Sequence, residues 1–408
     1  MNDRKKTSHL KILEKIADIA ASERNDYLMR AKRSGRKVIG FFCSYVPEEI
    51  IHAAGFIPYR MRAVASSGTE KGDIYFSSLN CTFVRHCFDK ALKGDFDFLD
   101  GIVFLNGCDH TRRLYDNWRY ADIPPVFRYM FVAPHKTGTT AEKRFNDEIG
   151  VFKKELERHF NVTISDETLA SSIKLYNRKR ALLQSIYETG KSREVPLRGS
   201  EFLRLMLALT AMPVEDSIAL LEELKGEIQG RSTARTGDLR IFLASGCVEE
   251  PDHLELIEEL GASIVADNIC LGARNFNLAV SEDDEPVPSL AKRYLYHLSC
   301  PRMMNTSRER LAYMQDTCRE FQVDAIIAEK LKFCDLWGGE LFLYRKESRK
   351  LGIPLLALER ELYGGSSGQM RTRIQAFYEQ VRNRKNTADV LFRAAGDDYQ
   401  ASNKNPVD

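Results

Sequence analysis

The stretch that decides the fold runs from Ser77 to Arg119 and reads SSLNCTFVRHCFDKALKGDFDFLDGIVFLNGCDHTRRLYDNWR. Its middle part, Gly101 to Leu105, has the length and bulk of a buried parallel strand. An amphipathic helical pattern lies on each side of this strand, and a cysteine opens each pattern, Cys81 the first and Cys108 the second. The stretch therefore predicts soft sulfur ligands at the ends of regular elements.

The two cysteines occupy positions that favour ligand binding. Cys81 opens the predicted helix Thr82 to Lys93, so we expect its sulfur near free backbone N–H groups and the positive end of the helix dipole. Both effects lower the pKa of a thiol and favour the thiolate. Cys108 follows the predicted strand, and open α/β sheets bind ligands outside the carboxyl ends of their strands.

The same order of elements occurs earlier in the chain. Val38 to Cys43 reads as a buried strand, Ile50 to Ala54 as a helix, and Phe56 to Met61 as the next strand. A strand, a loop with a cysteine, a helix and a strand form a βαβ unit of a parallel sheet. With a further strand at Pro125 to Val132, residues 37–140 predict a first α/β lobe.

The rest of the chain is predicted to be helical at its start and centre, with a second lobe after the centre. Residues 1–36 are expected to form solvent-exposed helices, and residues 141–237 a helical insert or linker bundle. Residues 238–386 show the same order of strands and helices as the first lobe, with cysteines or glycines after strands. Residues 387–408 are predicted to be a polar, frayed tail. The predicted fold is therefore α/β, with two doubly wound parallel-sheet lobes, a helical N-terminus and a helical insert between the lobes.

Composition narrows the class of protein. A chain of 408 residues predicts two or three domains. Its 60 basic and 58 acidic residues give a net charge of +2, which does not favour nucleic acid or a membrane surface as the main partner. The first residues are charged rather than apolar, and no later run approaches the roughly 18 apolar residues of a membrane span. We therefore expect a cytoplasmic protein.

The cysteines indicate metal binding rather than disulfides. There are nine, an odd number, in a chain with no secretory signal. Those that follow a predicted strand would converge on one cleft if the two lobes face each other: Cys43, Cys108, Cys247, Cys270 and Cys334. The alternative is that a free cysteine is a small buried hydrophobe, which fits Cys87 and Cys318 well.

The spacing of the cysteines favours one kind of metal site over another. No C-x₂₋₄-C pair is present, which disfavours structural zinc. Widely separated thiolates from two lobes suit an iron–sulfur cluster better. From the spacing alone, the choice of ligands stays open.

Several segments resemble the benzoyl-CoA reductase / 2-hydroxyacyl-CoA dehydratase (2-hydroxyglutaryl-CoA dehydratase D-component) subunit family. They occur in the order of the family and reach from about residue 38 to 380: Cys43-Ser-Tyr-Val-Pro-Glu-Glu-Ile-Ile-His-Ala-Ala-Gly55, Asn80-Cys81-Thr-Phe-Val-Arg85, Asn106-Gly-Cys108-Asp-His-Thr-Arg-Arg113, Phe333-Cys334-Asp335 and Gly368-Gln-Met-Arg-Thr-Arg373. The resemblance implies two flavodoxin-like lobes with helical additions. It also implies that Cys81, Cys108 and Cys334 hold a [4Fe–4S] cluster between the lobes, a ligand set that the spacing only permits.

The resemblance further implies an enzyme of anaerobic metabolism. In that family the cluster passes a single low-potential electron to the carbonyl of a CoA thioester, and two homologous subunits pair. We lean to aromatic acyl-CoA reduction, with dehydration of a 2-hydroxyacyl-CoA to an enoyl-CoA, or an electron-relay subunit, as alternatives. The sequence has no G-x-x-x-x-G-K-[ST] loop, so ATP hydrolysis would fall to a separate activator with its own cluster. A heterodimer is expected, and a homodimer is the alternative.

Two residues near Cys43 are candidates for catalysis. Glu49 is a candidate acid or base, and the alternative is a carboxylate that stabilises the start of its own helix. Ser44 is a candidate hydrogen-bond partner of a substrate carbonyl, and the alternative is a helix cap.

Four further residues are candidates for substrate binding. His110 and Arg112 lie beside Cys108, where cationic donors would stabilise a cluster or an anionic acyl group; a solvated helix face is the alternative. Gly368 and Arg371 open the last predicted helix, where a CoA phosphate could bind. For these two, an inter-subunit contact is the alternative.

Three more cysteines make a larger cluster an alternative. Cys43, Cys270 and Cys300 bring the number of cysteines at loop or helix-edge positions to six when they are added to the first three. Six thiolates suffice for a double-cubane [8Fe–9S] cluster, the type found in relatives within the superfamily. Iron and sulfide counts distinguish the two cases, with about four of each per chain for a single cube and about twice that for a double one.

Overall fold

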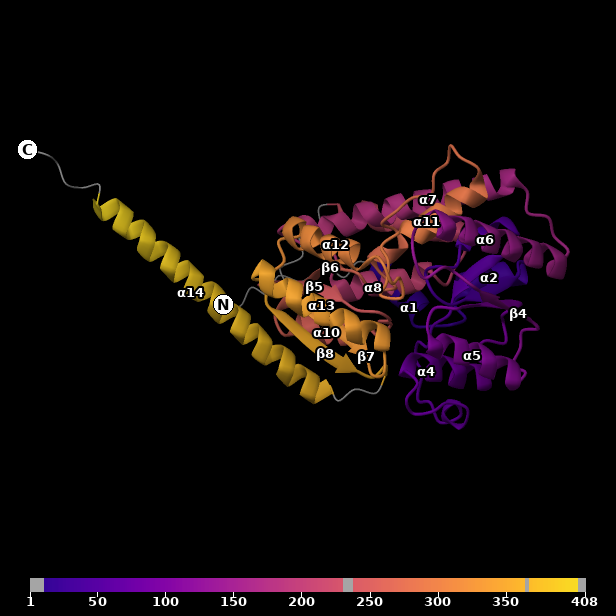
Figure 1. The fold of residues 1–408 in the computed structure, drawn as a ribbon, viewed down its shortest axis with the longest axis horizontal. Coiled ribbons are helices and arrows are strands. Elements are labelled where there is room, and N and C mark those ends of the chain that lie inside the picture. Colours follow the sequence, from indigo (N-terminus) through magenta and orange to yellow (C-terminus); the bar gives the residue numbers. More distant parts are fainter. Residues whose placement is uncertain (1–10, 230–237, 364–366, 403–408) are drawn as a thin grey trace, which may run out of the picture.

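The structure is a computed structural model that describes residues 11–229, 238–363 and 367–402, with side chains described through 385 except at 367. It contains two four-stranded parallel sheets that lie side by side (Figure 1). The first has the order β2–β1–β3–β4 and the second the order β6–β5–β7–β8. The strands are β1 Val38–Phe41, β2 Ile57–Arg60, β3 Gly101–Leu105, β4 Phe127–Phe131, β5 Leu239–Ala244, β6 Ala262–Asp267, β7 Ala325–Leu331 and β8 Leu355–Arg360.

This architecture confirms the predicted fold class of two doubly wound lobes. Strand order reverses between β1 and β3 in the first sheet and between β5 and β7 in the second, which is where such sheets bind ligands. Strands β1, β3 and β5 are buried along their whole length because helices cover both faces of each sheet.

The helices carry the chain between strands and cover the sheets. In chain order they are α1 Lys11–Ala20, α2 Asp26–Arg33, α3 Glu48–Ala53, α4 Thr82–Leu92, α5 Asp109–Tyr120, α6 Thr139–Phe160, α7 Asp166–Tyr187, α8 Gly199–Leu209, α9 Val214–Ile228, α10 Pro251–Glu259, α11 Pro286–Tyr296, α12 Ser307–Glu320, α13 Asp335–Leu351 and α14 Ser367–Ser402. Short 3-10 turns are η1 Gly72–Ile74, η2 Glu188–Lys191 and η3 Ala273–Asn275.

The two lobes exchange helices. In the core of the first sheet, Phe145 and Ile149 of α6 pack together with Leu290 of α11, although α11 comes from the second half of the chain. In the core of the second sheet, Ile12 and Ile16 of α1 pack among residues of α8 and β5. The chain therefore crosses between the lobes more than once, which ties them into one body.

The prediction that the N-terminal helices are solvent-exposed was wrong for α1. Ile12 and Ile16 are each only 1% exposed. They are four residues apart and so lie on one face of the helix, and that face packs into the second lobe.

The C-terminal end of the chain is also more regular than expected. The polar tail predicted from residue 387 continues as helix α14 to Ser402, and α14 projects beyond the second lobe (Figure 1). The lobe boundary predicted at residue 237 lies outside the described residues.

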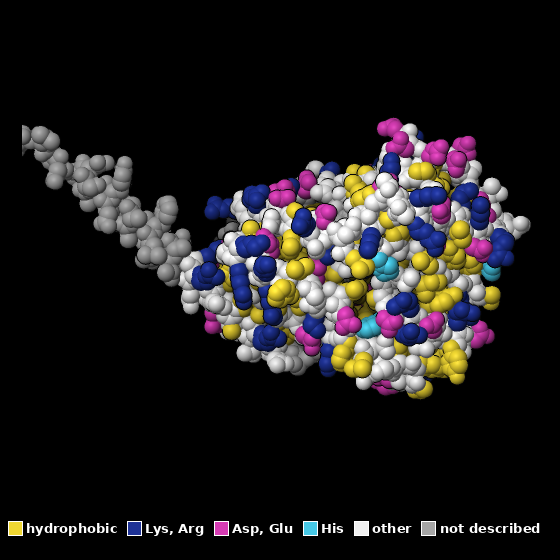
Figure 2. Space-filling model, viewed as in Figure 1, with side chains coloured by type: hydrophobic (Ala, Val, Ile, Leu, Met, Phe, Trp, Pro, Cys, Tyr) yellow, Lys and Arg dark blue, Asp and Glu magenta, His cyan; other side chains and the backbone are white. Residues whose placement is uncertain are grey.

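The surface matches the balanced composition. On the face drawn in Figure 2, basic, acidic and apolar side chains are interspersed over both lobes. Among the helices of the described ranges, none combines the length and apolar character that crossing a bilayer requires.

The carboxyl ends of the two sheets face each other. Ala63, after β2, donates its backbone N–H to Glu249 Oε2, after β5, at 2.9 Å. Leu362, after β8, donates its N–H to Thr82 Oγ1 at the start of α4, also at 2.9 Å. Loops that follow strands of one lobe thus bond to the other lobe, as the sequence predicts for a site between them.

Candidate metal centre between the lobes

Three cysteines occupy the same position at the start of three helices. Cys81, Cys108 and Cys334 are the N-cap residues of α4, α5 and α13. We call them the first thiol group. In each case the sulfur interacts with the backbone N–H of the third helical residue, which is Val84, Thr111 or Trp337. These N–H groups and the helix dipoles favour negative charge on sulfur.

The first thiol group draws on both lobes. Cys81 and Cys108 belong to the first lobe, whereas Cys334 follows β7 of the second and packs against the hydrophobic cores of both. Phe333, directly before Cys334, has a left-handed backbone with φ of 64° and turns the chain sharply between β7 and α13. The sulfur of Cys334 is thereby brought to the junction of the lobes.

The thiols of this group are near enough to affect one another's protonation. Burial raises the pKa of the Cys81 thiol well above its ordinary value, and negative charge on Cys108 and Cys334 raises it further. Burial likewise raises the pKa of Cys334 to about 11, with Cys108 adding to the effect. The predicted lowering of the Cys81 pKa was therefore wrong, because burial outweighs the helix terminus. A nearby cation such as a metal ion would favour ionisation of these thiols at neutral pH.

Three other cysteines form a second thiol group: Cys43, Cys270 and Cys300. Burial raises the pKa of the Cys300 thiol to about 12, although the guanidinium of Arg274 lowers it. Negative charge on Cys43 and Cys270 raises this pKa further. Cys270 also contributes to the raised pKa of Cys334. The second group therefore adjoins the first at this pair of cysteines.

The donor set suits a cluster better than a single ion. Within the part of the chain that the structure describes, no three His, Cys, Asp or Glu side chains lie close enough to hold one metal ion. A cube spreads its thiolates over different iron atoms, so its ligands need not meet at one point. Three cysteine sulfurs near backbone N–H groups are of the soft donor type, with the sulfur hydrogen bonds, that such clusters use.

The structure places His110 beside the first thiol group. The backbone N–H of Cys81 donates to His110 Nδ1 at 3.1 Å. Burial lowers the pKa of this half-buried imidazole, so it is neutral at pH 7 and accepts rather than donates at Nδ1. His110 thus connects the starts of α4 and α5.

The other predicted substrate residues lie on exposed surfaces. Arg112 is 52% exposed in its side chain and bonds Asp109 of its own helix at 3.2 Å. Gly368 is exposed in the first turn of α14, and Arg371 pairs with Glu259 of α10 at 3.3 Å. The preceding glycine-loop residues, 364–366, lie outside the described residues.

Glu49 and Ser44 differ in their surroundings. Glu49 is fully buried and accepts hydrogen bonds from Arg180 of α7 and, at 2.7 Å, from Tyr294 of α11. Burial alone would raise its pKa, yet Arg180 and Arg293 lower it overall, so Glu49 is a carboxylate that joins three helices. Ser44 is buried directly beside Cys43, so it is the one of the two that adjoins a thiol.

Sequence reasoning missed a set of buried residues around the second thiol group. Tyr45 comes two residues after Cys43, Arg274 four after Cys270 and Arg302 two after Cys300. Arg274 Nη1 donates to the sulfur of Cys270 at 3.3 Å, and the backbone N–H of Arg302 donates to that of Cys300 at 3.4 Å. The available signal was a large aromatic or basic residue shortly after each of these cysteines.

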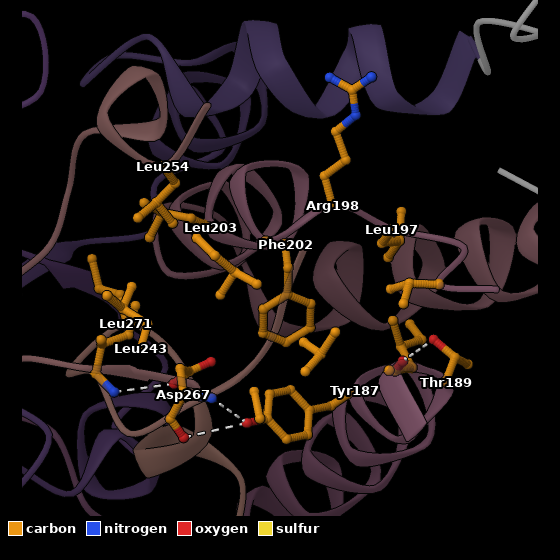
Figure 3. Close-up of a pocket in the computed structure, with 18 residues that line it drawn as sticks. Tyr187, Thr189, Leu197, Arg198, Phe202, Leu203, Leu243, Leu254, Asp267 and Leu271 are labelled. Atoms are coloured by element: carbon orange, nitrogen blue, oxygen red, sulfur yellow. Dashed lines mark hydrogen bonds between the residues drawn. The ribbon is translucent and has the colours of Figure 1, made fainter. Parts of the chain in front are cut away.

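A separate pocket lies inside the second lobe between α8 and the strands β5 and β6. The rings of Tyr187 and Phe202 lie 5.6 Å apart, and the Tyr187 hydroxyl accepts the backbone N–H of Asp267 at 2.7 Å (Figure 3). Leucines such as Leu203 and Leu254 make up much of the rest of the wall. The residues that line this pocket include no cysteine, so it is distinct from the thiol groups.

Comparison with known proteins decides the family. The family model described as 2-hydroxyglutaryl-CoA dehydratase, D-component, matches residues 43–381. The chain belongs to this family. The match confirms the resemblance seen in the sequence, and it begins at Cys43 and includes both thiol groups.

Several named proteins are similar to this chain along most of its length. Lactoyl-CoA dehydratase subunit beta of Anaerotignum propionicum is 25% identical over 91% of this chain and 98% of its own length. A benzoyl-CoA reductase subunit of Thauera aromatica is 27% identical over 82% of this chain and 88% of its own. The beta subunit of (R)-2-hydroxyglutaryl-CoA dehydratase of Acidaminococcus fermentans is 24% identical, with 91% and 99% covered. The relatives of this chain thus include subunits of both dehydratases and a reductase of CoA thioesters.

Proposed function

We propose that this chain is the iron–sulfur subunit of an ATP-activated acyl-CoA enzyme, and that Cys81, Cys108 and Cys334 hold a [4Fe–4S] cluster. The observation that carries the proposal is the shared N-cap position of these three cysteines at the junction of the lobes. When bound, such a cluster supplies single electrons of low potential to an acyl-CoA.

The residues around the first thiol group would hold the cluster and keep water away from it. Cys81 lies in a core cluster with Phe42 and Phe104, whose rings stack at 5.3 Å. Burial and hydrogen bonds to sulfur are the means by which a protein sets the potential of an iron–sulfur cluster. Three protein thiolates leave one iron of a cube without a protein ligand, where a substrate can bind.

The substrate is proposed at the level of class. The names of the relatives include both a benzoyl-CoA reductase and dehydratases of 2-hydroxyacyl-CoA compounds. Aromatic acyl-CoA reduction is the first class to test, and dehydration of a 2-hydroxyacyl-CoA to an enoyl-CoA is the second.

The proposed enzyme needs further proteins. The relatives are named as subunits, which supports a homologous second subunit for this chain. No Walker-type ATP loop occurs in the sequence, which supports a separate ATP-dependent activator with its own cluster.

The test is anaerobic purification of the chain with its natural partner subunit, followed by assays with activator and ATP. Benzoyl-CoA and lactoyl-CoA represent the two substrate classes. We expect turnover of one of them that requires ATP. Turnover of neither, or turnover without the iron-loaded chain, would refute the proposal.

A second candidate is a larger cluster held by all six cysteines of the two thiol groups. Its support is the electrostatic effect of Cys270 on the pKa of Cys334, which indicates that the two groups adjoin. Iron analysis separates the candidates, with about four iron atoms per chain for a single cube and about eight for a double-cubane cluster.

An electron-relay role is the remaining alternative, and acyl-CoA distinguishes it from a substrate-binding role. Added to the iron-loaded chain, acyl-CoA should change the EPR spectrum if the cluster binds substrate. An unchanged spectrum favours a relay to the partner subunit.

A further inference from the structure

Four buried polar side chains beside the second thiol group have atoms without a partner. Tyr45 and Arg274 are 0% exposed, His297 is 1% and Arg302 is 2% exposed. Within the described ranges, no hydrogen-bond partner reaches Tyr45 Oη, Arg274 Nε and Nη2, His297 Nε2 or Arg302 Nε. We call these four residues the Arg274 cluster. A buried polar atom without a partner is costly, so a group of them indicates a ligand.

The members of the Arg274 cluster lie together at the junction of the lobes. The rings of Tyr45 and His297 have centroids 4.6 Å apart, and the Arg302 guanidinium lies 4.5 Å from the centre of the Tyr45 ring. The positive charge of Arg274 acts on both Tyr45 and His297. One ligand could therefore serve several of these atoms.

The two arginines differ from three other buried arginines of the chain. Arg62, Arg310 and Arg360 each form an ion pair with a carboxylate, at 3.0 Å, 2.6 Å and 3.2 Å for the nitrogen Nε. Across the described chain, neither Arg274 nor Arg302 has a carboxylate within 4.0 Å. Buried charges are normally paired, so a negative charge is missing here.

The bonds that the two arginines do make leave this charge uncompensated. Arg302 donates to the backbone carbonyls of Ala133 and Pro134 at 2.9 and 3.0 Å. Arg274 donates to the sulfur of Cys270. Carbonyl oxygens satisfy N–H groups but carry no net charge, and the free N–H groups of both guanidiniums are strong donors to an anion.

His297 adds an acceptor to this set of donors. Its Nδ1 lies 2.9 Å from the carbonyl oxygen of Tyr294, so Nδ1 carries the proton and Nε2 has a free lone pair. The complementary ligand is therefore compact and anionic at the arginines, and His297 Nε2 lies beside it as an acceptor that the anion itself does not use.

We propose that the Arg274 cluster is an anion site, in which Arg274 and Arg302 donate hydrogen bonds to a compact anion. Two sources supply this chemistry. One is inorganic sulfide of a metal cluster held by the second thiol group, which rests on the second candidate function. The other is a free carboxylate, which does not depend on iron.

The experiment uses the full chain, prepared anaerobically in chloride-free buffer, in two forms. The iron-free form is titrated with formate by calorimetry, and the iron-loaded form is analysed for iron and sulfide and by EPR. The variants are Arg274→Gln and Tyr45→Phe, the second of which removes only a hydroxyl and so preserves packing. The control is Arg382→Gln, because Arg382 is a more exposed arginine paired with Asp238 at 2.9 Å.

A free-anion site predicts saturable formate binding to the iron-free chain, weakened at least tenfold by Arg274→Gln and less by Tyr45→Phe. A sulfide site predicts no formate binding, with a changed EPR spectrum or lower sulfide content in both variants. The control should behave as wild type in both forms. The proposal is overturned if both variants match wild type in formate binding, sulfide content and EPR spectrum.

The two forms also separate this proposal from the proposed function. If the chain binds no iron but formate binding depends on Arg274, the cluster assignment fails and the anion site stands. If iron loads normally but neither formate binding nor the EPR spectrum depends on the Arg274 cluster, the anion site fails and the cluster assignment stands.

Discussion

The two thiol groups use the same residue type in different settings. In the first, each sulfur caps a helix and interacts with fixed backbone N–H groups. In the second, the cysteines lie in loops beside buried arginines, and Arg274 donates a side-chain N–H to Cys270. Backbone donors survive any side-chain substitution, whereas the arginine does not. The first group therefore keeps its hydrogen-bond donors when side chains are substituted. In the second group, a substitution can change the charge around the sulfur atoms.

The largest expected effect is the loss of iron when a cysteine of the first thiol group is substituted. Cys81→Ser or Cys108→Ser should each abolish stable cluster binding, because serine is a poor ligand for iron in a soft-sulfur site. Iron and sulfide per chain are the measurement. Cys87→Ser is the matched control, because Cys87 is fully buried on α4 and belongs to neither group, and it should retain iron. Full iron content in both ligand variants would contradict the assignment.

The next effect asks whether the second group binds iron as well. With a single cube on the first group, Cys270→Ser should leave about four iron atoms per chain, as in wild type. A fall from about eight iron atoms to about half would establish the larger cluster instead.

Much of the fold could be predicted because its signals are local. The strand at Gly101–Leu105 and the helix predicted from Thr82 to Lys93 follow from an apolar run and from helical periodicity, and the structure has them at those residues or within one. The parallel topology also predicts that strand-end cysteines meet, and in the structure Cys108 and Cys270 both act on the pKa of Cys334.

What could not be predicted depends on burial and pairing across the fold. The exposure of α1 was misjudged because its apolar face is covered by the distant helix α8. The pKa of Cys81 was misjudged because burial in the folded protein is invisible in a local helix-terminus argument. The Arg274 cluster was missed because the lack of a carboxylate partner is a property of the assembled junction.

At Cys81, burial affects the pKa more than the nearby N–H donors do. The same balance can be tested at the carboxyl group of Glu249, at the junction of the lobes. Glu249 is 2% exposed, and burial raises its pKa to about 7 despite the N–H of Ala63. The folded state then holds an extra proton between the unfolded pKa of about 4.3 and about 7, so the unfolding free energy falls as pH rises through this window. The loss should be on the order of 2 to 3 kcal/mol.

Glu249→Gln should remove most of this pH dependence while its amide oxygen keeps the bond to Ala63. Urea unfolding between about pH 5 and pH 8 measures the effect. Glu222→Gln, at an exposed carboxyl paired with Arg178, is the control. Equal slopes for wild type and Glu249→Gln would show that burial does not dominate at the junction.

The smallest effect concerns the cap of α5. Thr111 Oγ1 accepts the backbone N–H of Cys108 at 3.2 Å and lies 3.5 Å from its sulfur. Thr111→Val should cost about 1 kcal/mol of stability and shift the EPR spectrum of the cluster without loss of iron. Thr168→Val, at the same helical position of α7 but with a serine cap, should cost similar stability and leave the spectrum unchanged. Identical spectra of both variants would place the cluster away from Cys108.

The most direct test of a cluster shared by the two lobes is the iron content of Cys334→Ser, because Cys334 is the proposed ligand from the second lobe. We predict that wild type prepared anaerobically carries about four iron atoms per chain or more, and that Cys334→Ser loses them. An iron-free wild type, or a Cys334→Ser chain with undiminished iron, would contradict the account.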